Sequence, residues 1–414
     1  MAASDPRYPT ATTTGWWIVS VAVALLHNGL WATPNLGFMS LIAGNPGSNP
    51  FPESLPGDYL LTSIAMPTLA ALLGQTAAHE VARLHLVVLL VGWAAVVALA
   101  QHTRGHRVAR LLTVVLAAAP IVTVSMQWLG QPDPLTAMCG VAIVLVRRRW
   151  SVVVLAVLAA LAHPEQALFM VTGACVLRTV LPPAEHELAG SEPLPDLLGL
   201  RGFSEVLYGL AGVLLGRLGT QVWFWINGIV VVTPRSSFLD SGIATFWDHH
   251  ARSPLLLLWS LWGPLWLFWA FAGFRLRSVL RDPGRAGPAR RAAIVGTAVA
   301  AAALVPVFVT LDETRVYAVV TAGLLAFGAV WVAEITGPRV SVRAAALLLA
   351  VTAVLPGVMA TGSSSSRADI GTVEMARFLL DGTVPREYRE PDGDDLVTEW
   401  LIAPFDIVTQ DPGG

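Results

Sequence analysis

The chain has 414 residues, of which 55% are hydrophobic and 13% are charged, and its formal net charge is -2. Soluble globular proteins carry about a quarter charged residues, so this composition excludes an ordinary soluble protein. The lack of excess positive charge argues against a nucleic-acid partner. Both cysteines, Cys139 and Cys175, fall within apolar runs, which indicates packing residues and excludes a disulfide or metal framework.

Apolar runs dominate the sequence. Because about 20 apolar residues cross the hydrocarbon core of a bilayer, the runs predict an all-α, polytopic transmembrane protein with about eleven spans. The runs are 15–32, 84–101, 111–129, 134–147, 151–163, 166–180, 203–224, 254–274, 292–310, 316–335 and 344–360. The predicted organisation is one transmembrane module, 1–360, followed by a short extracytoplasmic segment, 361–414, that packs against the outer face.

A further apolar stretch, 60–74, contains Pro67 and has polar residues on both sides. It predicts an interfacial or re-entrant helix after the first outer loop, and not a crossing. Four arginine clusters then fall on one side, which the positive-inside rule assigns to the cytoplasm. This predicts a multi-pass protein of the cell (inner) membrane with a cytoplasmic N-terminus and an extracytoplasmic C-terminus. The arginine clusters lie at 104–110, 147–149, 275–291 and 339–343.

Ionisable groups collect on the opposite, outer side, at the ends of apolar runs. Such groups at membrane depth are costly and are usually paired, cavity-facing or functional; the simpler alternative is that loops are polar because they meet water. They occur in separate outer segments as Glu53 and Asp58, Asp133, His163 and Glu165, the 235–250 group of Arg235, Asp240, Asp248, His249 and His250, and Asp312, Glu313 and Arg315.

Two carboxylates have restricted positions. Asp58 ends a loop rich in Gly, Pro and Asn and precedes the 60–74 stretch; it suits a helix cap or a general base at the membrane surface. Asp133 lies between two prolines, which hold it near the surface or simply form a turn.

Imidazole and guanidinium groups occupy two further turns. His163 and Glu165 flank Pro164, where a continuous helix must end. Arg315 offers a bidentate fork to a phosphate or carboxylate, or pairs internally with Asp312 at i,i+3 spacing. Adjacent His249 and His250 point in different directions on a helix, so no metal and no cofactor is predicted; a divalent metal has no supporting motif.

This layout resembles the membrane-embedded glycosyltransferases of the C-type (GT-C) superfamily. The residues that carry the resemblance are Glu53, Asp58, Asp133, His163, Glu165 and Arg315. It implies a polyprenyl-phosphate sugar as donor, a glycan or lipid acceptor, and a first-loop carboxylate as base, with Asp58 the first choice and Glu53 the second. The predicted substrate-binding residues are Asp133, His163, Glu165, Arg235, His249, Asp312 and Arg315.

Other function classes remain open at this point. A polymerase or ligase of lipid-linked glycans would use the same face and the same residue types. A secondary transporter should show internal repeats and charges near the midplane; no repeat is visible, and Arg217 is the only charge well within a span. A scaffold has no reason to cluster acids on one face. Nucleotide-binding and common hydrolase motifs do not occur in their required contexts.

Overall fold

The computed structural model describes residues 13–31, 35–51, 58–181, 200–232, 254–308, 310, 312–336, 338–355, 357–361, 364–366 and 372–383. The elements are α1 (Thr13–Asn28), α2 (Asn35–Gly44), the 3-10 helix η1 (Asp58–Thr62), α3 (Ala65–Leu72), α4 (Ala78–Arg104), α5 (His106–Ala117), α6 (Pro120–Gln127), α7 (Asp133–Leu145), α8 (Arg149–Ala162), α9 (Pro164–Val180), α10 (Leu200–Asn227), α12 (Pro254–Trp262), α13 (Leu265–Val279), α14 (Pro283–Ala302), α15 (Leu304–Val307), α16 (Glu313–Val320), α17 (Ala322–Ile335), α18 (Pro338–Val354), the strands β1 (Met359–Thr361) and β2 (Ser364–Ser366), and α19 (Thr372–Asp381).

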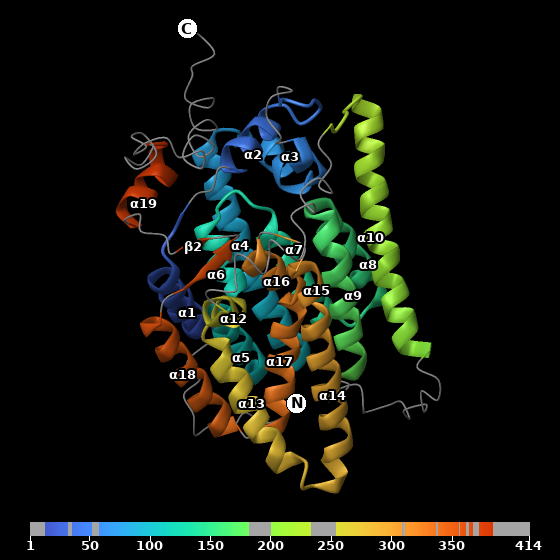
Figure 1. Ribbon diagram of the computed structural model, residues 1–414, viewed down its shortest axis with the longest axis vertical. Coiled ribbons are helices and arrows are strands. Elements are labelled where there is room, and N and C mark those ends of the chain that lie inside the picture. Colours follow the sequence, from blue (N-terminus) through green and yellow to red (C-terminus); the bar gives the residue numbers. More distant parts are fainter. Residues whose placement is uncertain are drawn as a thin grey trace.

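The predicted arginine loops gather at one end of the helices, which we call the arginine end. Arg107 donates a hydrogen bond to the Thr336 carbonyl oxygen, Arg147 to Thr103, Arg178 to Arg147, and Arg285 to Glu334. These bonds join the α4–α5, α7–α8, α13–α14 and α17–α18 connections. The helices therefore alternate between the arginine end and the opposite end, which carries α2, α3 and α19 (Figure 1) and is called the site end below.

Every predicted apolar run contains a helix or two helices in succession. By length and composition, two helices of the described chain, 78–104 and 283–307, are able to cross a membrane, and five segments are able to if each bent pair counts as one span. Other apolar helices, such as Asp133–Leu145 and Arg149–Ala162, are shorter than a full crossing. The polytopic helical class is confirmed, whereas the expected number of about eleven spans is not established by helix length alone.

The core is built around α17, which is apolar on all sides and buried along nearly its whole length. A helix that is apolar all round lies in a protein core or in the hydrocarbon of a membrane, and α17 packs against α5, α7 and α9. Helices α5 and α7 are also buried over most of their residues. This central group fixes the positions of the turns that lie at the site end.

Three pairs of helices bend sharply inside apolar runs that the sequence predicts as single spans. The bends are 51° between α5 and α6, 76° between α12 and α13, and 51° between α16 and α17. Pro120 starts α6 and Pro264 precedes α13, and a proline supplies no backbone N–H for the preceding turn. Non-helical backbone at membrane depth is tolerated where protein buries it, as at the fully buried 117–120 break.

The site end carries short elements that lie across the ends of the long helices (Figure 1). Stretch 60–74 forms η1 and the eight-residue α3, too short to cross, as predicted. The first outer loop is rich in Gly, Pro and Asn, and no helix was predicted in it, but residues 35–44 form α2, because this part of the loop lacks the prolines that follow it. The short antiparallel β1–β2 hairpin was also not predicted.

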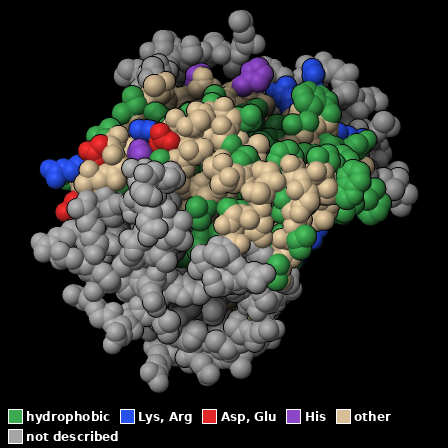
Figure 2. Space-filling view, turned by 90° about the horizontal axis from the view of Figure 1, so that it is seen from above, with side chains coloured by type: hydrophobic (Ala, Val, Ile, Leu, Met, Phe, Trp, Pro, Cys, Tyr) green, Lys and Arg blue, Asp and Glu red, His purple; other side chains and the backbone are tan. Residues whose placement is uncertain are grey.

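Figure 2 looks down on the site end of the molecule. Hydrophobic side chains reach the surface there among polar ones. Leu72 and Leu73 at the end of α3 are exposed, as are Trp225 and Ile226 at the end of α10. Helix α19 packs on the start of α4, where Arg83 donates a hydrogen bond to the Leu379 carbonyl oxygen. The described part of the C-terminal segment therefore packs against this face.

Helix α10 approaches α8 through a Gly-x-x-x-Gly spacing. A Cβ on Gly212 would lie 2.6 Å from the Val153 carbonyl oxygen, and one on Gly216 would lie 2.7 Å from that of Val157. Small residues at this spacing allow two helix backbones to pack closely in a membrane. The opposite face of α10 is left exposed and apolar.

Gly212→Ala is therefore expected to force α10 away from α8 and to lower the free energy of unfolding by about 1–3 kcal/mol. The matched control is Gly219→Ala, whose Cβ would lie at an ordinary 3.7 Å from Leu161, and which should be neutral or slightly stabilising because alanine favours helix. Denaturant titration in mixed micelles compares the two variants, and equal stabilities would contradict this packing.

Candidate functional site

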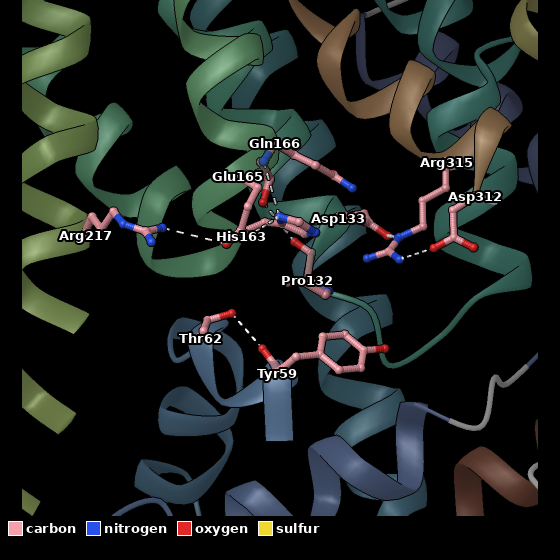
Figure 3. A network of polar contacts seen from close by, with 11 residues as sticks. Tyr59, Thr62, Pro132, Asp133, His163, Glu165, Gln166, Arg217, Asp312 and Arg315 are labelled. Carbon is pink, nitrogen blue, oxygen red and sulfur yellow. Dashed lines mark hydrogen bonds and ion pairs between the residues drawn. The ribbon is translucent and has the colours of Figure 1, made fainter. Parts of the chain in front are cut away.

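A buried ion-pair cluster joins two turns that lie far apart in sequence. Arg315 Nε donates a 2.7 Å hydrogen bond to Asp133 Oδ2, across 182 residues, and Arg315 Nη1 donates a 2.8 Å bond to Asp312 Oδ2. The Asp133 side chain is 0% exposed, that of Arg315 9% and that of Asp312 35%. Figure 3 shows the Arg315 guanidinium between the two carboxylates, of which Asp312 is the more exposed.

The turn before α7 places Asp133 by its backbone conformation. Gly130 has a φ of +106°, and a Cβ there would lie 2.7 Å from the Leu36 Cα, so only glycine fits. Pro132 and Pro134 then start α7 with Asp133 in its first turn. In the same turn Trp128 lies under the guanidinium, with Arg315 Cζ 5.7 Å from its ring centroid, at a distance typical of a cation–π contact.

The α8–α9 turn forms a second part of the network. His163 caps α9: its Nδ1 accepts a 3.4 Å hydrogen bond from the Gln166 N–H and lies 3.6 Å from Glu165 Oε2. Glu165 Oε1 lies 3.7 Å from Nη1 of Arg217 on α10. In the view of Figure 3, His163 and Glu165 lie between Arg217 and Asp133.

The 3-10 helix η1 contributes the third part of this polar network. Tyr59 and Thr62 belong to the network of Figure 3, and Thr62 Oγ1 donates a 2.7 Å hydrogen bond to the Tyr59 carbonyl oxygen. Asp58 is the first residue of η1. The predicted base therefore begins the element that carries Tyr59 to the polar network.

The structure brings together Asp133, Asp312 and Arg315, and separately His163 and Glu165, in one network of polar contacts (Figure 3). Predicted residues Glu53, Arg235 and His249 lie outside the described residues. Within the described ranges, no group of three or more His, Cys, Asp or Glu side chains is arranged to hold a metal ion.

Two glutamines were missed by the sequence interpretation. Gln131 is 1% exposed, and neither its amide nitrogen nor its amide oxygen has a hydrogen-bond partner among the described residues. The buried Gln166 likewise has no partner there for its side-chain oxygen. Leaving a buried polar group unpaired costs about 1–3 kcal/mol, so these amides indicate where water or ligand hydroxyls bind. In the sequence, Gln131 and Gln166 lie within three residues of the candidate residues Asp133 and His163, and this proximity is the signal that could have identified them.

The charges of the Arg315 cluster decide what it is able to bind. One guanidinium faces two carboxylates, so the cluster has an excess of negative charge and two of the Arg315 nitrogens are already engaged. No described residue accepts a hydrogen bond from Arg315 Nη2. This arrangement favours neutral hydroxyls over an anion, because a phosphate would meet Asp133 and Asp312 at close range.

No protein-family model matches the chain, and no curated protein sequence matches it. Its fold is similar to two crystal structures of ArnT from Cupriavidus metallidurans. The apo structure aligns with a TM-score of 0.40 at 18% identity, over 80% of this chain and 62% of that one. The structure bound to undecaprenyl phosphate aligns with a TM-score of 0.44 at 17% identity, over 91% and 67%. The chain therefore spans less than two thirds of the length of the apo structure.

Proposed function

We propose that the protein is a C-type membrane glycosyltransferase that moves a sugar from a polyprenyl-phosphate donor to an acceptor hydroxyl at the extracytoplasmic face. The observation that carries the proposal is the buried contact of Arg315 with Asp133, at the end of the helices opposite the arginine loops. Buried charges in a membrane protein are expensive and are kept where they serve a site.

The chemistry requires a base, a pocket for the sugar and a cation for the phosphate. The bond between the sugar C1 and the phosphate oxygen breaks, and a new bond forms between C1 and the acceptor oxygen. The acceptor proton passes to a carboxylate, for which we propose Asp58 first and Glu53 second. The polyprenyl phosphate, of which undecaprenyl phosphate is an example, leaves with the electron pair. No nucleotide-binding fold is needed.

The Arg315 cluster serves the sugar in this proposal. Asp133 and Asp312 hold the guanidinium in a fixed orientation, and Nη2 donates to a sugar oxygen. The Asp312 carboxylate, which is partly exposed, and the amides of Gln131 and Gln166 offer acceptors and donors to hydroxyl groups. Sites built to hydrogen-bond a hydroxyl discriminate strongly against ligands that lack it.

The test is a reconstituted transfer reaction. The purified full chain in liposomes receives a panel of polyprenyl-phosphate hexoses and pentoses together with a cell-envelope extract as acceptor. Mass spectrometry is expected to detect free polyprenyl phosphate that forms with one donor sugar and only with acceptor present. Release of polyprenyl pyrophosphate from pyrophosphate-linked glycans would identify a polymerase or ligase instead, and no release from either donor class would overturn the proposal.

The orientation is tested by cysteine labelling of intact cells with a membrane-impermeant maleimide. We expect Glu390→Cys to react from outside and Arg281→Cys, at the arginine end, to react only after permeabilisation, because arginine-rich loops stay cytoplasmic. Native Cys139 and Cys175 are buried and serve as the unreactive background. The reverse labelling pattern would place the site on the cytoplasmic side.

A further inference from the structure

Arg217 is a charged residue on the exposed side of the long helix α10. Its side chain is 56% exposed on α10, and the neighbouring Leu214, Leu215 and Leu218 are exposed as well. The opposite face of α10 is fixed against α8 by Gly212 and Gly216. Helix α10 is therefore held so that Arg217 and these leucines face outward, away from α8.

Arg217 was expected well within a span, but the structure places it level with the ends of neighbouring helices. It lies beside Glu165, in the first turn of α9 and directly after the end of α8. Where spans end, the hydrocarbon gives way to the lipid headgroups, so a guanidinium there meets phosphate groups. Long basic side chains near helix ends extend toward this interface.

The guanidinium of Arg217 has unused hydrogen-bonding capacity. It carries five N–H donors, and in the described part of the chain its ion pair is with Glu165 at 3.7 Å, beyond hydrogen-bond distance. The Glu165 side chain is itself 41% exposed and also lies 3.6 Å from His163. Arg217 thus differs from Arg315, whose nitrogens bond two carboxylates at 2.7 and 2.8 Å.

We propose that Arg217 binds the phosphate of an anionic lipid that reaches the site sideways from the bilayer, with Glu165 as the internal carboxylate that the phosphate displaces. Arginine donors match phosphate oxygens in a bidentate geometry, and the neighbouring leucines contact the lipid chain. The identity of this lipid as the polyprenyl-phosphate donor rests on the proposed function. The phosphate site itself does not, because a bulk phospholipid offers the same chemistry.

Lipid retention tests the site without any turnover. The full chain, in detergent and loaded separately with undecaprenyl phosphate or phosphatidylglycerol, is examined by native mass spectrometry. Arg217→Gln is expected to lower retained undecaprenyl phosphate by at least about 10-fold, whereas Arg291→Gln, which removes an exposed arginine at the arginine end, stays within about twofold. Equal thermal unfolding of the two variants confirms that both fold.

Two further results separate the interpretations. Glu165→Gln removes the internal competitor and should keep or raise retention, which a merely structural Arg217–Glu165 pair does not predict. Loss of phosphatidylglycerol together with undecaprenyl phosphate in Arg217→Gln supports a phosphate site occupied by bulk lipid. Unchanged retention of both lipids in Arg217→Gln overturns the site, even if the transfer reaction is confirmed. Failure of transfer with intact Arg217-dependent retention overturns only the proposed reaction.

Discussion

Asp133→Ala is expected to lower the free energy of unfolding by about 3–5 kcal/mol, because it removes one partner of a buried ion pair and leaves the other charge uncompensated. Asp133 is fully buried and bonds Arg315 Nε at 2.7 Å. Arg315 is also buried, with its guanidinium against Trp128. Denaturant titration in mixed micelles, followed by tryptophan fluorescence, measures the loss.

Two controls separate pairing from general damage. Asp312→Ala removes a partner that is 35% exposed, and exposed pairs contribute about 0–1 kcal/mol, so this variant should stay close to the parent. The double variant Asp133→Leu with Arg315→Leu removes both charges and should recover most of the stability, since apolar replacements of buried pairs are often neutral. Equal losses in Asp133→Ala and Asp312→Ala would contradict a buried pair.

The positions of the long helices followed from the sequence because the bilayer imposes a strong local rule. Spans must be apolar for about 20 residues and must satisfy their own backbone hydrogen bonds. The α4 run shows this well: it was expected over 84–101 and lies within the helix Ala78–Arg104, which is long and apolar enough to cross. Stretch 60–74 was predicted equally well as a non-crossing segment, since Pro67 and its polar flanks break the pattern.

Helix breaks inside apolar runs are less visible, because hydropathy does not report backbone geometry. The α16–α17 bend at Thr321 interrupts a run with no proline and no glycine at the break. Helix α2 was hidden by the prolines and glycines of the same loop. The α16–α17 break thus has no signal in the local sequence, whereas the proline-free stretch 35–44 could have been recognised as helical.

Pairing between turns is also tertiary information. The sequence offered an i,i+3 pair of Arg315 with Asp312 as the alternative to ligand binding, and this pair forms. The buried partner, Asp133, comes from another turn, and no local pattern connects the two. Trp128 and Gln131 flank the same turn, but neither signals a contact until α16 is packed against α6 and α7. The candidate residues and their common face were thus predictable from the sequence, whereas the particular pairs that they form were not.

Asp58→Asn is expected to reduce turnover of the transfer reaction by about 10²- to 10⁴-fold, the usual contribution of a general base. Asp58 begins η1, the element that carries Tyr59 to the polar network of the site. Asparagine keeps the size and most of the hydrogen-bonding capacity of the side chain but is not basic. The variant should therefore insert normally and unfold at the same temperature as the parent.

The neighbouring carboxylate of the first loop is the matched control for this role. Glu53→Gln removes the same charge from the same loop and, if Asp58 is the base, should change turnover by less than about tenfold. Measuring kcat and KM for the donor separates a loss of catalysis from a loss of donor binding. Loss of a base lowers kcat and leaves KM for the donor nearly unchanged. Loss of turnover in Glu53→Gln with an active Asp58→Asn would assign the base to Glu53. Full activity of both variants would exclude the first loop from the chemistry and direct the search to Asp312, the partly exposed carboxylate of the Arg315 cluster.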